Sequence, residues 1–290
     1  MFNFILYPVS AILWFWHAIF GSLLGPANGF GWALAVFFLV FTVRSLLIRP
    51  ALRQLRSARV AQRLAPQLSA LRQRYRGDSQ RLAFQIRQLH ADSGSSIFGG
   101  LLPALLQIPV FLSLNAVLRG FAPTAQSNHI FSSAGVQSFL DADLFGAKLG
   151  NWLSQPAAAL HHFGTDRAAM VTVGVPLMLL AGSATYLIMR LSMRRQQRAG
   201  ITQSPQFAKV GALMMYLAPV GVLISGSFFP LPLGLLLYFL ATNLWTLGQT
   251  HVLGGIVDRE QRQLRDAEER AMAERKQASR PKPGQRPRRR

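Results

Sequence analysis

One arginine stands inside a stretch of this chain that is otherwise apolar. Arg44 lies within FFLVFTVRSLLIRP, residues 37–50. A charged side chain at the centre of a bilayer costs roughly 2.5–3.5 kcal/mol on insertion scales, so such residues usually mark functional sites. Arg49 follows five residues later, about 7–8 Å along a helix, and a snorkelling side chain could cover that distance. The position predicts either a snorkelling cation or a cation in a polar cavity.

A second polar group lies along the apolar segment 231–253. At 100° per residue, nearly all of its polar side chains and two aromatic ones fall on one side of a helix. A lipid-facing helix would not collect amides and hydroxyls in this way, so the stripe faces either other helices, through hydrogen bonds, or water. The residues of this stripe are Tyr238, Thr242, Asn243, Trp245, Thr246, Gln249 and Thr250.

The segment 98–118 adds two amides, Gln107 and Asn115, and two prolines that should bend its helix. Familiar catalytic patterns are missing from the sequence, which has no H-E-x-x-H, P-loop or G-x-S-x-G. It also has no cysteine, and the pair His161 and His162 has no neighbouring ligand for a metal. The segments that could span a membrane hold no Asp or Glu for a proton or sodium relay. We therefore expect no enzyme, no metal site and no cofactor.

The composition of the chain is that of a membrane protein, so these polar residues must be positioned by membrane-spanning helices. Half of the 290 residues are hydrophobic and 14% are charged, against about 25% charged in an average soluble domain. Several segments are long and apolar enough to cross roughly 30 Å of hydrocarbon as helices. The sequence thus predicts an all-α polytopic membrane protein with five spans. Their apolar cores are 31–49, 98–118, 168–191, 207–225 and 231–253.

The net charge of +20 is distributed unevenly, and this predicts the orientation. Ten Lys and Arg residues lie between 49 and 89, five between 190 and 209, and twelve from 259 onward. Because basic loops remain in the cytoplasm, these regions are expected there. Residues 120–166 hold one lysine and three aspartates, and residues 226–230 hold no charge, so both are expected outside.

The first 29 residues contain no Lys or Arg, and the basic start of a signal peptide is missing, so no cleavage is expected. Pro8, Trp14 and Trp16 suit a helix that lies at the outer interface, where aromatic rings settle. A sixth span, which would place the N-terminus in the cytoplasm, is the alternative that these residues leave open.

Residues 51–96 have the pattern of a basic helical hairpin. Apolar residues recur every three or four positions in two runs, Gly77 and Asp78 separate the runs, and arginines fill the other faces. Residues 254–290 are a second basic region, a charged helix followed by an end that we expect to be disordered. These charges are either simply solvated or bind anionic lipid or ribosomal RNA, and the sequence does not separate these ligands because both offer phosphates.

Four stretches have an order and spacing that resemble a known family. They are TVRSLLIRPALRQ (42–54), RLAPQLSALRQRYRGD (63–78), GSSIFGGLLPALLQIPVFLSL (94–114) and PLPLGLLLYFLATNLWTLGQ (230–249). The chain resembles the YidC/Oxa/Alb membrane protein insertases, in the short bacterial form without a large extracytoplasmic domain. The resemblance implies a five-span helical core around a hydrophilic groove that opens to the cytoplasm and to lipid, an N-terminal interfacial helix and a mobile cytoplasmic hairpin.

The resemblance also implies a function and partners. The protein would be an insertase and chaperone that receives the polar tail of a nascent membrane protein beside a central arginine. Ribosomes, through the tail and hairpin, anionic lipids and the Sec translocon are further candidate partners, and DNA is not. A membrane assembly scaffold without insertase activity and a small-solute channel or transporter are the alternatives. The implied client-binding groove consists of Arg44, Gln107, Asn115, Tyr238, Asn243, Trp245, Thr246 and Gln249.

The expected organisation, with flanking residues included, places the chain in a bacterial plasma membrane with its N-terminus outside and its C-terminus in the cytoplasm. It consists of an interfacial helix at 1–29, spans at 30–50, 97–119, 167–191, 207–225 and 231–253, the cytoplasmic hairpin at 51–96, an outer loop at 120–166, a cytoplasmic loop at 192–206, an outer turn at 226–230 and a cytoplasmic tail at 254–290.

Overall fold

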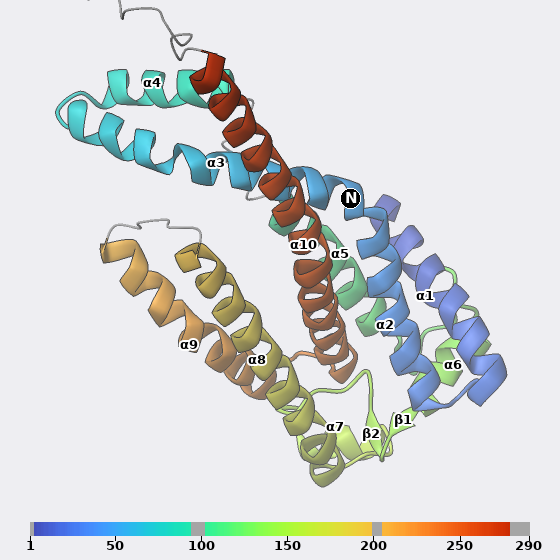
Figure 1. The fold of residues 1–290 in the computed structure, drawn as a ribbon. Coiled ribbons are helices and arrows are strands. Elements are labelled where there is room, and N and C mark those ends of the chain that lie inside the picture. The colour runs from blue at the N-terminus through green and yellow to red at the C-terminus, as the bar shows by residue number, and fades with distance from the viewer. Residues whose placement is uncertain (1–2, 94–101, 199–204, 279–290) are drawn as a thin grey trace, which may run out of the picture. The chain divides into compact units, whose positions relative to one another are not determined.

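The computed structural model describes residues 3–93, 102–198 and 205–278, and nearly all regular structure in them is helical (Figure 1). The expectation of an all-α polytopic membrane protein is confirmed. The chain divides into two compact units, Met1–Gly248 and Gln249–Arg290. The elements are α1 (Asn3–Leu24), α2 (Gly29–Leu46), α3 (Ile48–Arg74), α4 (Ser79–Asp92), α5 (Leu102–Gly120), α6 (Ser133–Asp141), β1 (Asp143–Leu144), β2 (Ala147–Lys148), α7 (Ala157–His162), α8 (Arg167–Arg198), α9 (Pro205–Phe228) and α10 (Leu233–Ala278).

Four segments of the described helices are long and apolar enough to cross a membrane: Phe4–Leu24, Gly29–Leu46, Arg167–Arg194 and Val210–Phe228. They lie in α1, α2, α8 and α9. The predicted second span corresponds to α5, with a shorter apolar part at Ile108–Gly120, and its first residues, 98–101, lie outside the described ones. The predicted last span begins α10, which continues into the tail as one helix. The expected disordered end lies partly at 279–290, outside the described residues.

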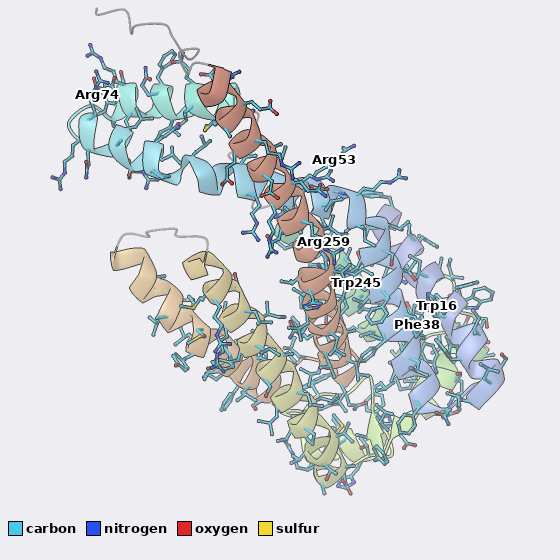
Figure 2. The ribbon with its side chains drawn as sticks, in the orientation of Figure 1. Trp16, Phe38, Arg53, Arg74, Trp245 and Arg259 are labelled. Atoms are coloured by element: carbon cyan, nitrogen blue, oxygen red, sulfur yellow. The ribbon has the colours of Figure 1, made fainter. Side chains whose placement is uncertain are left out.

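Helix α1 packs along α2 (Figure 1). The Trp16 ring lies on Phe38, with centroids 4.7 Å apart, and its Nε1 donates a hydrogen bond of 2.9 Å to Thr42 Oγ1 (Figure 2). Asn28 caps the start of α2 by accepting from the backbone N–H groups of Phe30 and Gly31. Because α1 is itself long and apolar enough to span, the interfacial position and the sixth span both remain predictions.

The basic segment after α2 forms two helices, α3 and α4, that contact each other. The break between them falls at Gly77 and Asp78, as the sequence indicates. Asp78 caps α4, because its Oδ1 accepts a 2.9 Å hydrogen bond from the Arg81 backbone N–H. The same carboxylate pairs with the Arg81 guanidinium at 3.2 Å, and the Asp78 N–H donates to the Tyr75 carbonyl at 3.1 Å across the turn.

Residues 121–166, expected only as a loop, fold into a compact layer that we call the cap. Trp32 of α2 is completely buried against it, and its ring lies 5.6 Å from that of Phe121, 5.5 Å from that of Phe131 and 5.0 Å from that of Phe139. Its Nε1 donates to Ser138 Oγ across 106 residues of sequence. These contacts join the cap to the start of α2 and the end of α5.

Backbone hydrogen bonds attach the cap to the last helix as well. The N–H of Leu233 donates to the Asn151 carbonyl at 2.9 Å, and the N–H of Gly234 donates to the Leu149 carbonyl at 2.9 Å. Orphan donors in the first turn of a helix need such partners. The cap therefore fixes the starts of α2 and α10, the two helices that carry most of the predicted site.

Candidate functional site

Arg44 lies in the last turn of α2 and is only partly exposed. A cation in that turn is favoured by the helix dipole. Its Nε is buried, yet it has no hydrogen-bond partner in the part of the chain that the structure describes. No carboxylate within residues 3–93, 102–198 and 205–278 forms an ion pair with it. Arg44 is thus a cation without a counter-ion in these segments.

Tyr238 and Thr242 of α10 accompany this cation. The Tyr238 side chain, 1% exposed, lies within electrostatic reach of the Arg44 guanidinium and close to Thr242. The Tyr238 hydroxyl and Thr242 Oγ1 are both buried and lie close to each other, and neither has a further hydrogen-bond partner among the described residues. Buried polar groups are nearly always paired in folded proteins, so this small cluster of buried polar atoms is the candidate site.

Trp245 stands on the same helix and faces α2. Its ring lies 5.4 Å from the ring of Phe41, one turn before Arg44. This contact brings α10 beside α2 near the cation. An aromatic wall next to a guanidinium combines an apolar face with a polar centre, which suits a segment that carries both kinds of side chain.

Asn243 is used differently. Its Nδ2 donates to the Ala181 carbonyl at 3.0 Å and to Thr185 Oγ1 at 2.9 Å, and both acceptors belong to α8. The amide therefore holds α10 against α8 by interhelical hydrogen bonds, one of the two roles that the stripe of polar residues allowed. Thr246 Oγ1 donates to the Thr242 carbonyl at 2.8 Å within its own helix.

Asn115 does not meet Arg44 in the structure. Its Oδ1 accepts from Arg119 Nε at 3.3 Å near the cap end of α5. Arg44 lies fifteen residues after the start of α2, about 22 Å from the cap, whereas Asn115 lies about 7 Å from it. The two side chains are thus at different levels of the bundle.

The structure does not show whether two further predicted groove residues lie near Arg44. Gln107 belongs to α5, but its side chain lies outside the described ones. Gln249 is the first residue of the second unit. The structure therefore brings together three of the predicted groove residues, Arg44, Tyr238 and Trp245. Thr242 lies beside them; the sequence analysis placed it on the polar stripe but did not count it among the groove residues.

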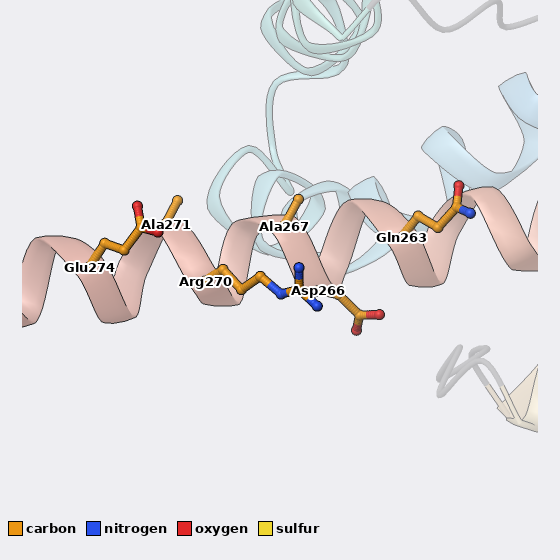
Figure 3. A pocket seen from close by; sticks show the side chains of 6 residues that line it. All are labelled: Gln263, Asp266, Ala267, Arg270, Ala271 and Glu274. Carbon is orange, nitrogen blue, oxygen red and sulfur yellow. The ribbon is translucent and has the colours of Figure 1, made fainter.

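The second unit contains an exposed helix face with charged side chains. The helix face shown in Figure 3 is lined by Gln263, Asp266, Ala267, Arg270, Ala271 and Glu274. Carboxylates and a guanidinium spaced four residues apart stabilise an exposed helix, which is a sufficient use for them. Among the described residues no group of His, Asp or Glu side chains could hold a metal ion.

Several helices long and apolar enough to span a membrane, together with a partly exposed arginine near the end of one of them, define the class of the protein as a multi-pass membrane protein. The model of one protein family, described as 60Kd inner membrane protein, matches residues 23–260. The chain belongs to this family, the YidC/Oxa/Alb family that four sequence stretches resemble, and that prediction is confirmed.

Three similar curated proteins carry the name membrane protein insertase YidC. The protein from Mycobacterium tuberculosis H37Rv is 41% identical, over 99% of this chain and 81% of its own length. That from Mycolicibacterium paratuberculosis is 40% identical, over 99% of this chain and 84% of its own. That from Streptomyces avermitilis is 30% identical, over 86% of this chain and 57% of its own. The chain is thus a multi-pass inner membrane protein.

Proposed function

We propose that this protein is a membrane protein insertase whose groove is lined by Arg44, Tyr238, Thr242 and Trp245. The observation that carries the proposal is the cluster of buried polar atoms without partners on α2 and α10. The names of the similar proteins support the same activity. Gln107 and Gln249 are proposed as further polar walls of the groove. Thr246 and Asn243 support it from α10, and Asn115 lies nearer the cap.

In this proposal Arg44 attracts the acidic or polar tail of a client. Water in the groove lowers the solvation penalty of the guanidinium and shortens the apolar barrier that the tail must cross. The client's apolar helix then moves into lipid, which favours insertion by about 25 cal/mol per Å² of apolar surface removed from water. A membrane potential that is negative inside favours outward movement of one negative charge by ~2.3 kcal/mol per 100 mV. No bond is made or broken, so the proposed activity is not enzymatic.

The proposed orientation follows from the basic segments. Helices α3 and α4 and the C-terminal region carry most of the Lys and Arg residues, so they are placed in the cytoplasm. The cap is then outside and closes the outer end of the groove, and the N-terminus is outside as well. Nascent membrane proteins enter past the hairpin, where ribosomes, the Sec translocon and anionic lipids are the proposed partners.

The test is insertion by the purified protein alone, reconstituted in vesicles with a small single-span client. Protease protection of the client's translocated tail is expected only in vesicles that contain the protein. If the client stays fully accessible, the protein is a scaffold rather than an insertase. A small-solute flux in the same vesicles without client insertion would instead identify a channel or transporter.

A further inference from the structure

We infer that a cavity in the cap binds the phosphate-bearing headgroup of an anionic phospholipid. The cavity measures about 260 Å³ and lies at the end of α5, beside β2 and the chain that follows β2. Arg119 and Lys148 supply two cations to its lining, and Trp152 and Phe163 supply aromatic walls. It is separate from the groove, because Arg44 lies about 22 Å along α2 from the cap.

Both cations keep donors for a ligand. Lys148 Nζ donates one hydrogen bond, of 2.7 Å, to the Asp141 carbonyl. Arg119 donates from Nη2 to the Pro230 carbonyl at 2.7 Å and from Nε to Asn115 Oδ1 at 3.3 Å. An ammonium has three donors and a guanidinium five. The bonds to the protein hold each side chain in place without using all of its donors, and phosphate oxygens accept such donors well.

None of the residues that line the cavity is acidic. Asp143 stands opposite Lys148 in the β1–β2 pair, but no ion pair joins these two side chains in the part of the chain that the structure describes. The three aspartates nearest in sequence, Asp141, Asp143 and Asp166, each accept a hydrogen bond from a donor three or four residues away in the chain. Two cations that share a concave site without an anion produce a positive potential that favours an anionic ligand.

The apolar part of the lining favours a lipid over a free anion. Part of the cavity lining is apolar and consists of Leu140, Phe163 and the Trp152 ring. Inorganic phosphate has no apolar group that could pack against these side chains. The cavity also lies at the end of α5, whose apolar part is Ile108–Gly120. In the proposed orientation this end of α5 is at the outer membrane interface, where headgroups are found and where tryptophan is enriched. Its volume falls below the roughly 300–1,000 Å³ of sites for drug-sized ligands. It therefore suits a headgroup with its glycerol, while the acyl chains remain in the bilayer.

A single fluorophore near the cavity tests this assignment. Since the sequence has no cysteine, S154C in the exposed turn beside Gln155 can be labelled alone. L23C, at an exposed position at the cap end of α1, is the matched reference. The protein is placed in nanodiscs that contain equal small fractions of nitroxide-labelled phosphatidylglycerol or phosphatidylcholine. Quenching of the S154C label by phosphatidylglycerol should exceed that by phosphatidylcholine, and it should do so more strongly than at L23C.

The decisive comparison is between variants that lack one cation of the cavity and a control variant that lacks a cation elsewhere. Lys148→Gln and Arg119→Gln should each reduce the local enrichment of phosphatidylglycerol about fivefold, the effect of one cation at an anionic lipid surface. Arg87→Gln, on exposed α4, should leave it unchanged. Arg119 also ties α5 to Pro230, so Lys148→Gln decides the result if Arg119→Gln lowers the melting temperature.

Three results would overturn the assignment. The first is equal quenching by the two lipids at S154C in the parent protein. The second is an enrichment that Lys148→Gln leaves intact. The third is complete loss of the enrichment when excess inorganic phosphate is added, which would assign the cavity to a soluble anion. Because binding is measured directly, the outcome is independent of whether the protein inserts clients.

Discussion

The charge of Arg44 should couple to the charge of the client's tail, and this coupling has a predictable size. Two unit charges 4 Å apart interact with about 4 kcal/mol at an effective dielectric constant of 20 and about 1 kcal/mol in water. Arg44 is partly exposed, and in the proposed hydrated groove the effective dielectric constant would lie between these limits. We expect a coupling free energy of about 1–2 kcal/mol, which corresponds to roughly 5- to 30-fold in insertion rate.

The assay is a double-mutant cycle in reconstituted vesicles. Insertion rates are measured for a client with an acidic tail and for the same client with a neutral tail, with parent protein and with Arg44→Ala. The acidic client should slow down by the factor above, and the neutral one should change little. Arg44→Lys should retain much of the rate because it keeps the charge. Arg72→Ala, an exposed cation on α3, is the matched control.

Equal slowing of both clients by Arg44→Ala would refute the proposed charge role. The cycle would then give no coupling energy, and Arg44 would act through packing between helices. A coupling that appears with Arg72→Ala as well would also refute it, because the effect would then come from the general positive charge of the hairpin.

Further predictions concern stability. Trp32→Ala should destabilise the protein by about 3–5 kcal/mol, the usual value for removing a buried Trp, and this should appear as a lower melting temperature in detergent. Asn243→Ala should lose about 0.6–1.7 kcal/mol, as for other hydrogen bonds between membrane helices, measured by unfolding in mixed micelles. Asp78→Ala should reduce protection from hydrogen exchange in α4, since losing such a cap costs about 0.5–2 kcal/mol. Gly226→Leu should lower the melting temperature, because the Met178 side chain occupies the space that a Cβ would need.

Periodicity and composition predicted much of this structure. The all-α class and the break between α3 and α4 at Gly77 and Asp78 follow from residues close together in sequence. Arg44 and the stripe on α10 could be identified because a polar group in a long apolar segment is conspicuous without any tertiary information. The same stripe could not show which of its members turns toward α8, and Asn243 does so because Thr185 and the Ala181 carbonyl happen to face it.

The cap was missed for a physical reason. Its core depends on Trp32 meeting rings that lie about a hundred residues later, and no local pattern records such a contact. Nothing in the sequence marked Arg119 as a binding residue either, since a single arginine at the end of a span is expected at any membrane interface. One partner, Asn115, lies one turn earlier in the same helix, whereas the Pro230 carbonyl lies in the connection between α9 and α10 and became visible only in the fold.

The close approach at Gly29 limits how far this protein can be shortened. The carbonyl of Asp143 lies where a side chain of residue 29 would begin, and the backbones of Asn28 and Asp143 form a bridge there. Deleting the segment that contains Asp143 to obtain a minimal, loop-free version would expose the indole of Trp32 and strip the first turn of α10 of its acceptors. A truncated version for engineering should therefore be shortened at its terminal tail, with the 121–166 region left whole.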